Sequence, residues 1–129
     1  MNDKNNIMRL EWVGKADEDL LSLEALLKHQ EGSPSTACFL AQQAIEKLLK
    51  SILVFHNAEL EKIHDLVVLT NKVKAYEPEI YKFIDQLKTI TGYYIETRYP
   101  ADRPEFTWEQ SKESFEVANK IREFAQSIS

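Results

Sequence analysis

The sequence is poor in the residues that stabilise disulfide-rich domains, many-stranded sheets and membrane spans. Its 129 residues include one cysteine, three glycines and four prolines. The single cysteine, Cys38, excludes an internal disulfide. So few glycines and prolines allow few turns, which favours long helices over a many-stranded sheet. The longest wholly apolar run, residues 37–41, is far shorter than the roughly 20 residues that a membrane-spanning helix needs.

Several kinds of chemical site are also excluded. The three glycines, Gly14, Gly32 and Gly92, are too far apart to form a phosphate-binding loop, and one cysteine excludes a CxxC pair. Glu61 and His64 have the E-x-x-H spacing of di-iron helical bundles. Such a site needs a second copy of the motif and further carboxylates, and the sequence has no second copy. We therefore predict that the protein holds no metal and no cofactor.

The charge balance is acidic. Sixteen lysines and arginines against 21 aspartates and glutamates give a net charge of −5. This balance argues against a general electrostatic attraction to nucleic acid, although a local basic patch remains possible. Residues 1–11 are polar and contain no signal-peptide core. We expect a cytoplasmic protein without a membrane segment, made of one domain over residues 1–129 with residues 1–6 frayed.

Residues 33–56 form the segment around which the predicted fold is organised. Ser33 is suited to cap a helix, and Pro34 to its first turn, where a missing N–H costs nothing. Apolar residues then recur with helical spacing for about five turns. Glu46 precedes Lys50 by four residues, the better orientation for an ion pair along a helix. Because the apolar face is too wide for a surface helix, we expect this helix at the centre of a bundle.

Further helices are predicted around this central one. The first covers about residues 7–29, the third covers residues 65–75, and the fourth follows Pro78. The last begins at Thr107, with Gln110 three residues later as in a capping box. The predicted fold class is all-α, an antiparallel four- or five-helix up-and-down bundle. Acidic residues of the first helix are interpreted as a solvated outer face, namely Asp17, Glu18, Asp19 and Glu24.

Three segments of the chain carry a resemblance to a known family. They are CFLAQQAIEKLLKSILVFH at residues 38–56, IHDL at residues 63–66 and RYP at residues 98–100. In order and spacing, behind a first helix that contains Trp12, they resemble small prokaryotic HEPN domains. The resemblance covers nearly the whole chain and implies a helical bundle that pairs into a homodimer. It also implies, as for relatives encoded beside a minimal nucleotidyltransferase, a partnership with such an enzyme.

The sequence departs from one feature of that family. Many HEPN domains are metal-independent ribonucleases that use an arginine followed, after four to six residues, by a histidine. Arg98 would need this histidine at position 103, 104 or 105, which hold Arg103, Pro104 and Glu105. Arg9, Arg103 and Arg122 also lack a histidine at this spacing. The catalytic pair is therefore not carried over, and we predict that the purified protein does not cleave RNA.

The best candidate for a binding site centres on Arg98. Tyrosine rings offer stacking faces, and the arginine fork fits a phosphate or a carboxylate. Lys47 and Lys50 share one face of the central helix, which makes that face cationic. If the loop around Arg98 folds back toward this helix, Arg98 and the lysines converge on one groove. The alternative is that Arg98 is structural and pairs with an acidic residue such as Glu46. The candidate residues are Arg98, Tyr94, Tyr99, His64, Asp65, Lys47 and Lys50.

The pair His64-Asp65 has two interpretations. In the first, Asp65 meets free N–H groups at the start of a helix and the His64 ring fills a gap between helices. In the second, both contribute to a groove beside the RYP segment. The sequence favours the first interpretation, because an aspartate ahead of an apolar run is a common helix start.

Three functions are compatible with these observations. The first is a non-catalytic HEPN binding module that partners a minimal nucleotidyltransferase in a toxin–antitoxin-like or nucleotide-handling system. The second is a ribonuclease with a departed active site. The third is a helical protein whose purpose is self-association. A homodimer is expected in each case, and nucleotide or RNA remains a possible ligand.

Overall fold

The computed structural model describes residues 3–93 and 106–129, with the side chains of residues 92 and 93 left out. These residues form five α-helices and one 3₁₀ helix and contain no strand, which confirms the all-α prediction. None of the described helices is long and apolar enough to cross a membrane. The elements are α1 (Asp3–His29), α2 (Pro34–Phe55), α3 (Leu66–Lys74), the 3₁₀ helix η1 (Pro78–Phe83), α4 (Ile84–Tyr93) and α5 (Trp108–Ser127).

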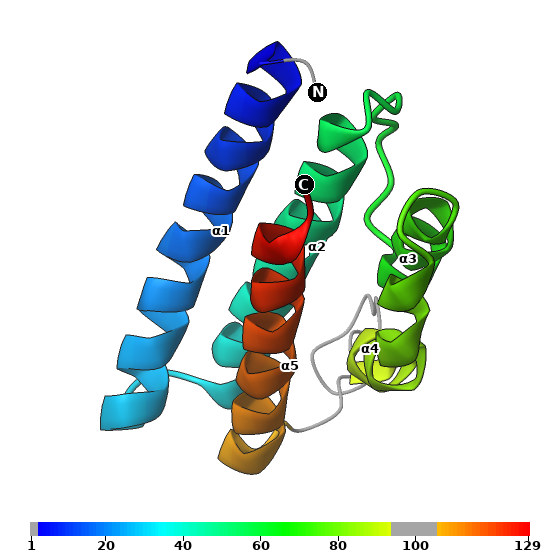
Figure 1. Ribbon diagram of the computed structural model, residues 1–129. Coiled ribbons are helices and arrows are strands. Elements are labelled where there is room, and N and C mark those ends of the chain that lie inside the picture. Colours follow the sequence, from blue (N-terminus) through cyan, green and yellow to red (C-terminus); the bar gives the residue numbers. More distant parts are fainter. Residues whose placement is uncertain (1–2, 94–105) are drawn as a thin grey trace.

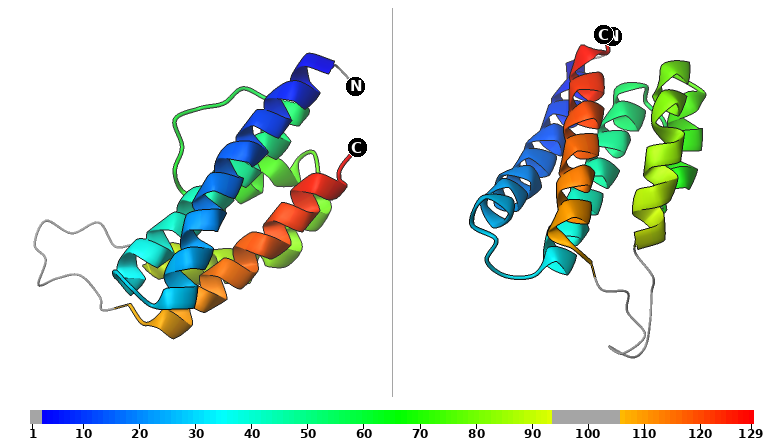
Figure 2. Two further views of the ribbon diagram at one scale, coloured as in Figure 1. Left: turned by 90° about the vertical axis from the view of Figure 1, so that its left-hand side faces the viewer. Right: turned by 90° about the horizontal axis from the view of Figure 1, so that it is seen from below.

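The helices form a bundle with α2 in the middle. The long helices α1 and α2 lie side by side and run in opposite directions (Figure 1). α5 packs against both and runs in the same direction as α2. Seen from below, α3 and α4 cover the side of α2 that lies away from α1 (Figure 2). α2 therefore contacts α1, α3, α4 and α5, as its broad apolar face predicts.

α2 is the most buried helix, which confirms the prediction for residues 33–56. The Ser33 side chain caps it by accepting a hydrogen bond from the Ser35 backbone N–H over 3.1 Å, and Pro34 occupies the first turn. Its apolar residues meet α1 and α5 on one side and α3 and α4 on the other. The fully buried ones are Ala37, Ala41, Ala44, Ile45, Leu48, Leu49 and Ile52.

The predicted starts of the other helices are mostly confirmed. Thr107 and Gln110 form the expected capping box of α5, and Asp65 caps α3 one residue before its first helical residue. α1 differs, because it begins at Asp3 and residues 3–6 are helical instead of frayed. Asn5 is only 8% exposed, which shows that this first turn packs against the bundle.

The acidic run of α1 is not simply solvated, contrary to the interpretation above. Asp17 accepts a hydrogen bond from the Arg122 guanidinium of α5 over 3.0 Å, and Asp19 accepts one from Lys47 of α2 over 2.6 Å. Both carboxylates lie at the border of the buried stripe of α1, where they reach cations of neighbouring helices. They therefore link α1 to the two helices that it packs against, while Glu18 and Glu24 are exposed.

Leu48 tests the central position of α2, because its side chain is completely buried. We expect Leu48→Ala to lower the free energy of unfolding by about 2–5 kcal/mol, since it removes buried apolar atoms and leaves a cavity. The matched control is Val68→Ala on α3, where the side chain is 41% exposed and the loss should be about 0.5 kcal/mol or less. Urea unfolding measures both. Equal losses would contradict a core centred on α2.

Cys38 tests the packing of α2 against α5. It is 2% exposed, and its Sγ lies 3.6 Å from the Ser111 Oγ. Burial raises the pKa of the Cys38 thiol, and hydrogen bonds with Ser111 and Ser114 lower it by less. Because the thiolate is the reactive form, we expect a thiol reagent to label the folded protein at least about tenfold more slowly than the urea-unfolded protein. Similar rates would show that this contact opens readily.

Candidate functional site

Asp65 belongs to the start of α3. Its Oδ1 accepts hydrogen bonds from the backbone N–H groups of Val67, over 2.8 Å, and of Val68, over 3.1 Å. These groups would otherwise have no partner within the helix. The first interpretation of Asp65 is therefore confirmed, since its carboxylate is occupied by the helix that it caps.

His64 is a surface residue that contacts α2. Its side chain is 77% exposed, and its Nδ1 lies 3.1 Å from the Glu46 Oε1. The expectation that the His64 ring fills a gap between helices is therefore wrong. The ring is held at the surface because the backbone turns at Asp65 to begin α3, and Glu46 is the polar group within its reach.

Glu46 connects His64 to a second residue, Lys50. The predicted pair between Glu46 and Lys50 is present, with the Lys50 Nζ 3.1 Å from the Glu46 Oε2. Both side chains are only 10% exposed, and the Lys50 Nζ lies 5.9 Å from the centre of the Trp12 ring. Glu46, Lys50 and His64 together are called the Glu46 cluster below. The carboxylate is its centre, because each of its two oxygens contacts one basic group.

Lys47 is separate from this cluster. Its Nζ donates to the Asp19 Oδ2 of α1, and the two side chains are 25% and 18% exposed. The sequence placed Lys47 and Lys50 on one cationic face. In the structure each lysine is paired with a carboxylate of the same chain, so this face carries little uncompensated positive charge. The idea of a free cationic surface on α2 is therefore wrong.

The remaining candidates, Arg98, Tyr94 and Tyr99, lie outside the described residues. Their approach to the Glu46 cluster thus stays a prediction. Glu46, which was considered as a structural partner for Arg98, already contacts Lys50 and His64. Among the described candidates, the structure brings His64 and Lys50 together through Glu46, and it leaves Asp65 and Lys47 with other partners.

Metal ligands do not gather in the part of the chain that the structure describes, where no three His, Cys, Asp or Glu side chains come close enough to hold an ion. The two residues with E-x-x-H spacing diverge. Glu61 accepts from Lys72 over 3.1 Å, whereas His64 contacts Glu46. The motif straddles the connection before α3, so its two side chains do not share a helix face.

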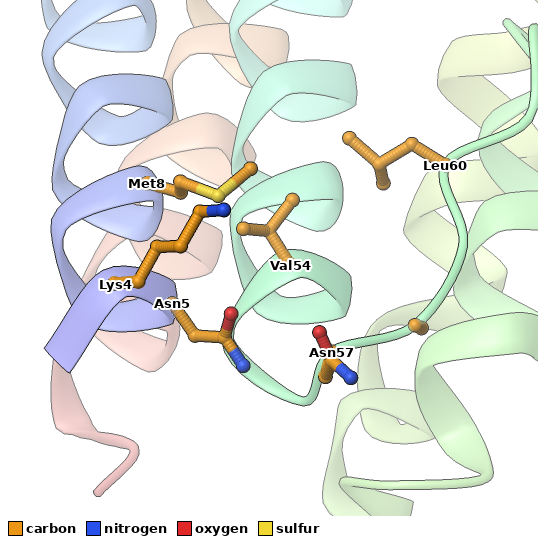
Figure 3. Close-up of a pocket in the computed structure, with 7 residues that line it drawn as sticks. Lys4, Asn5, Met8, Val54, Asn57 and Leu60 are labelled. Atoms are coloured by element: carbon orange, nitrogen blue, oxygen red, sulfur yellow. The ribbon is translucent and has the colours of Figure 1, made fainter. Parts of the chain in front are cut away.

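The structure also shows a hollow that the sequence did not predict. It has a volume of about 450 Å³ and lies between the start of α1, the end of α2 and the connection that follows (Figure 3). The sequence analysis missed it because residues 1–6 were expected to fray. The signal was the position of Asn5, which continues the buried spacing of α1 backward from Val13. The lining residues are Lys4, Asn5, Met8, Val54, Asn57, Ala58 and Leu60.

The Glu46 cluster makes a specific stability prediction. Glu46→Ala should lower the free energy of unfolding by about 3 kcal/mol or more, because it leaves the Lys50 ammonium buried without its counter-charge. Replacing both residues, as in Glu46→Leu with Lys50→Met, should recover most of that loss. The comparison is Lys72→Ala, which breaks a partly exposed pair with Glu61 and should cost less than about 1 kcal/mol. Urea unfolding distinguishes these outcomes, and an equal cost for Glu46→Ala and Lys72→Ala would refute a buried pair.

Comparisons with known proteins agree with this architecture. The HEPN domain family model matches residues 10–128. A crystal structure of an archaeal HEPN homologue has the same fold, with a TM-score of 0.71, 23% sequence identity, and coverage of 92% of this chain and 94% of that chain. A search of curated proteins found no match. Because the family match extends over nearly the whole sequence, the chain belongs to the HEPN domain family.

Proposed function

We propose that this protein is a non-catalytic HEPN binding module whose partner is a minimal nucleotidyltransferase, in a toxin–antitoxin-like or nucleotide-handling system. The observation that carries this proposal is the internal pairing of the polar residues on α2. Lys47 is paired with Asp19, and Lys50 with Glu46. A face whose lysines are already paired with carboxylates is better suited to bind a protein surface than a polyanion.

The electrostatic reason is the cost of freeing either lysine. Binding of a phosphate requires a cation that is available to it, as in the release of counterions when proteins bind nucleic acid. Turning Lys50 toward a phosphate would leave Glu46 buried beside His64 without its ammonium partner. The net charge of −5 acts in the same direction, since it repels a polyanion at long range.

The histidines support the non-catalytic part of the proposal. General acid–base cleavage of RNA needs an imidazole that is free to exchange protons with the substrate. The His56 Nε2 lies 2.7 Å from the Glu77 Oε2, and its ring stacks on Tyr76 with the ring centres 5.0 Å apart. His64 contacts Glu46, and His29 lies in the last turn of α1. None of the three has an arginine at the spacing of the HEPN ribonucleases.

One observation favours the second candidate, a ribonuclease with a departed active site. His64 is exposed, and the Glu46 carboxylate lies beside its Nδ1, an arrangement that orients the imidazole ring. In such a site Nε2 of the ring would face the substrate. This candidate is separated from the binding module by a cleavage experiment.

The first test of the proposal is therefore incubation of the purified protein with structured and unstructured RNA. We expect no cleavage above that of a mock purification, for the wild type and for His64→Ala alike. His29→Ala is the matched control, because it removes an exposed histidine in the last turn of α1 that is not part of the Glu46 cluster. Cleavage that His64→Ala abolishes and His29→Ala preserves would establish the ribonuclease in place of the binding module.

The second test is binding to a minimal nucleotidyltransferase from the same organism, measured by calorimetry. We expect a complex that Arg98→Ala weakens by about tenfold or more while the melting temperature of the free protein is unchanged. Arg98→Lys should restore little of the affinity, because lysine keeps the charge and loses the two-pronged fork. A parallel loss of thermal stability would make Arg98 structural, and the absence of any complex would reject the proposed partner.

A further inference from the structure

The hollow between the start of α1 and the end of α2 contains two asparagine side chains. Figure 3 shows the Asn5 amide extending from α1 toward Asn57, which follows the C-terminal end of α2. The volume of about 450 Å³ is within the range of about 300–1,000 Å³ that is usual for ligand pockets. The hollow therefore has room for a small ligand or for a short piece of a peptide. Its apolar lining residues are Met8, Val54, Ala58 and Leu60.

Asn5 is buried without a hydrogen-bond partner of its own chain. The residue is 8% exposed, and its side-chain amide makes no hydrogen bond to any residue that the structure describes. Asn5 continues the buried stripe of α1, where an apolar side chain would be buried at a lower cost than an amide. The fold of the free chain therefore does not use this amide, and it faces the hollow.

Asn57 has a structural reason for its residue type, and its amide remains available. Its backbone φ is 58°, in the left-handed region that asparagine tolerates better than most residues, just after α2 ends. Its backbone N–H donates to the Val54 carbonyl over 2.9 Å. Its side chain is exposed and makes no hydrogen bond within the described part of the chain. The turn thus holds a second amide at the hollow.

The connection after α2 brings backbone groups to the same place. Residues 58–61 form neither helix nor strand. The Ala58 N–H donates to the Leu53 carbonyl over 2.9 Å, whereas the N–H groups of Glu59 and Leu60 donate to no group in residues 3–93 or 106–129. Such a segment beside an apolar hollow offers hydrogen bonds to the backbone of an extended peptide, as in β-augmentation.

We propose that this hollow binds an extended segment of a partner protein, through one apolar side chain and the peptide groups beside it. The apolar side chain lies against Met8, Val54 and Leu60. The amides of Asn5 and Asn57 each offer N–H donors and a carbonyl acceptor, which match the C=O and the N–H of a peptide group. The ligand class is therefore an uncharged stretch of polypeptide with an apolar anchor.

The charge of the lining favours a peptide over a nucleotide. Lys4 is the one charged side chain among the described residues that line the hollow. A nucleotide with several phosphate charges needs more than one cation or several N–H donors around each phosphate. The net charge of −5 adds repulsion at long range. An uncharged peptide segment needs no counter-charge, and its apolar side chain gains from burial in the hollow.

This inference goes beyond the proposed function, because it requires no nucleotidyltransferase and uses residues other than Arg98 and His64. The experiments below measure peptide binding alone. Their failure leaves the ribonuclease and nucleotidyltransferase experiments unaffected. In the same way, RNA cleavage or the lack of a nucleotidyltransferase complex does not change the result expected for a peptide.

The first experiment titrates the full chain with two capped tripeptides and follows the amide signals by NMR. One peptide has leucine between two alanines, and the other has asparagine, of similar size, in place of the leucine. We expect the leucine peptide to shift the side-chain signals of Asn5 and Asn57 and the backbone signal of Leu60. It should bind at least about tenfold more tightly than the asparagine peptide, because it buries an apolar side chain. Equal binding of the two peptides, shifts elsewhere on the bundle, or no shift at millimolar peptide would overturn the proposal.

The second experiment distinguishes a binding amide from a structural one. Asn5→Leu has nearly the same size and completes the apolar stripe of α1, so the melting temperature should be unchanged or higher. The affinity for the leucine peptide should fall at least about tenfold, because a peptide group loses its partner. Asn71→Leu is the matched control, since it makes the same change at an exposed position of α3 outside the hollow. An Asn5→Leu protein with a lower melting temperature and unchanged affinity would make Asn5 structural and reject the site.

The third experiment removes the other amide and keeps the turn. Asn57→Gly should fold like the wild type, because glycine adopts a positive φ readily. Circular dichroism and the melting temperature check this. We expect the affinity for the leucine peptide to fall by about threefold or more, a smaller loss than in Asn5→Leu because Asn57 is exposed to water. An affinity equal to that of the wild type would overturn a site built on two amides.

Discussion

The burial of α2 against four other helices is the constraint on which the rest of the structure depends. A helix that is apolar on so much of its surface cannot remain at the edge of a small protein, so α1 and α5 cover one side and α3 and α4 the other. Because α2 is covered on several sides, some of its polar residues are also removed from water and pair with opposite charges. Glu46 and Lys50 are buried together, and Lys47 meets Asp19 of α1. The ion pairs of Glu46, Lys47 and Lys50 therefore follow from the packing of α2.

The same constraint limits what the domain can do. A buried ion pair is costly to break, so Lys50 is held beside Glu46, whereas His64 remains at the surface. Membership of the HEPN family fixes the fold and does not by itself fix the activity, because one fold can carry different sites. The outer face of α1 carries exposed apolar residues, and a Cβ atom added at Gly14 would meet nothing within 4 Å.

The fold was largely predictable, and the reasons are local. A period of 3.6 residues marks each helix, and the caps lie within one turn of what they cap, as with Ser33 and with Thr107 and Gln110. The two places where the structure differs from the prediction also have physical reasons. Residues 3–6 look polar and frayed in sequence, yet Asn5 lies in phase with the buried stripe of α1 and packs with it. His64 was expected between helices, and the turn at Asp65 keeps it outside.

The sequence by itself determined the helices, their caps and the pair between Glu46 and Lys50, because all of these depend on residues close together in the chain. It also indicated the family, through the order and spacing of three short segments. Only the tertiary structure decided the partners of the acidic residues of α1. Asp19 meets Lys47 across 28 positions, and Asp17 meets Arg122 across 105 positions. No spacing rule reaches so far along the chain. Such pairs form because the packing of apolar faces brings the borders of helices together. That packing gave Lys47 a carboxylate partner that the sequence alone did not predict.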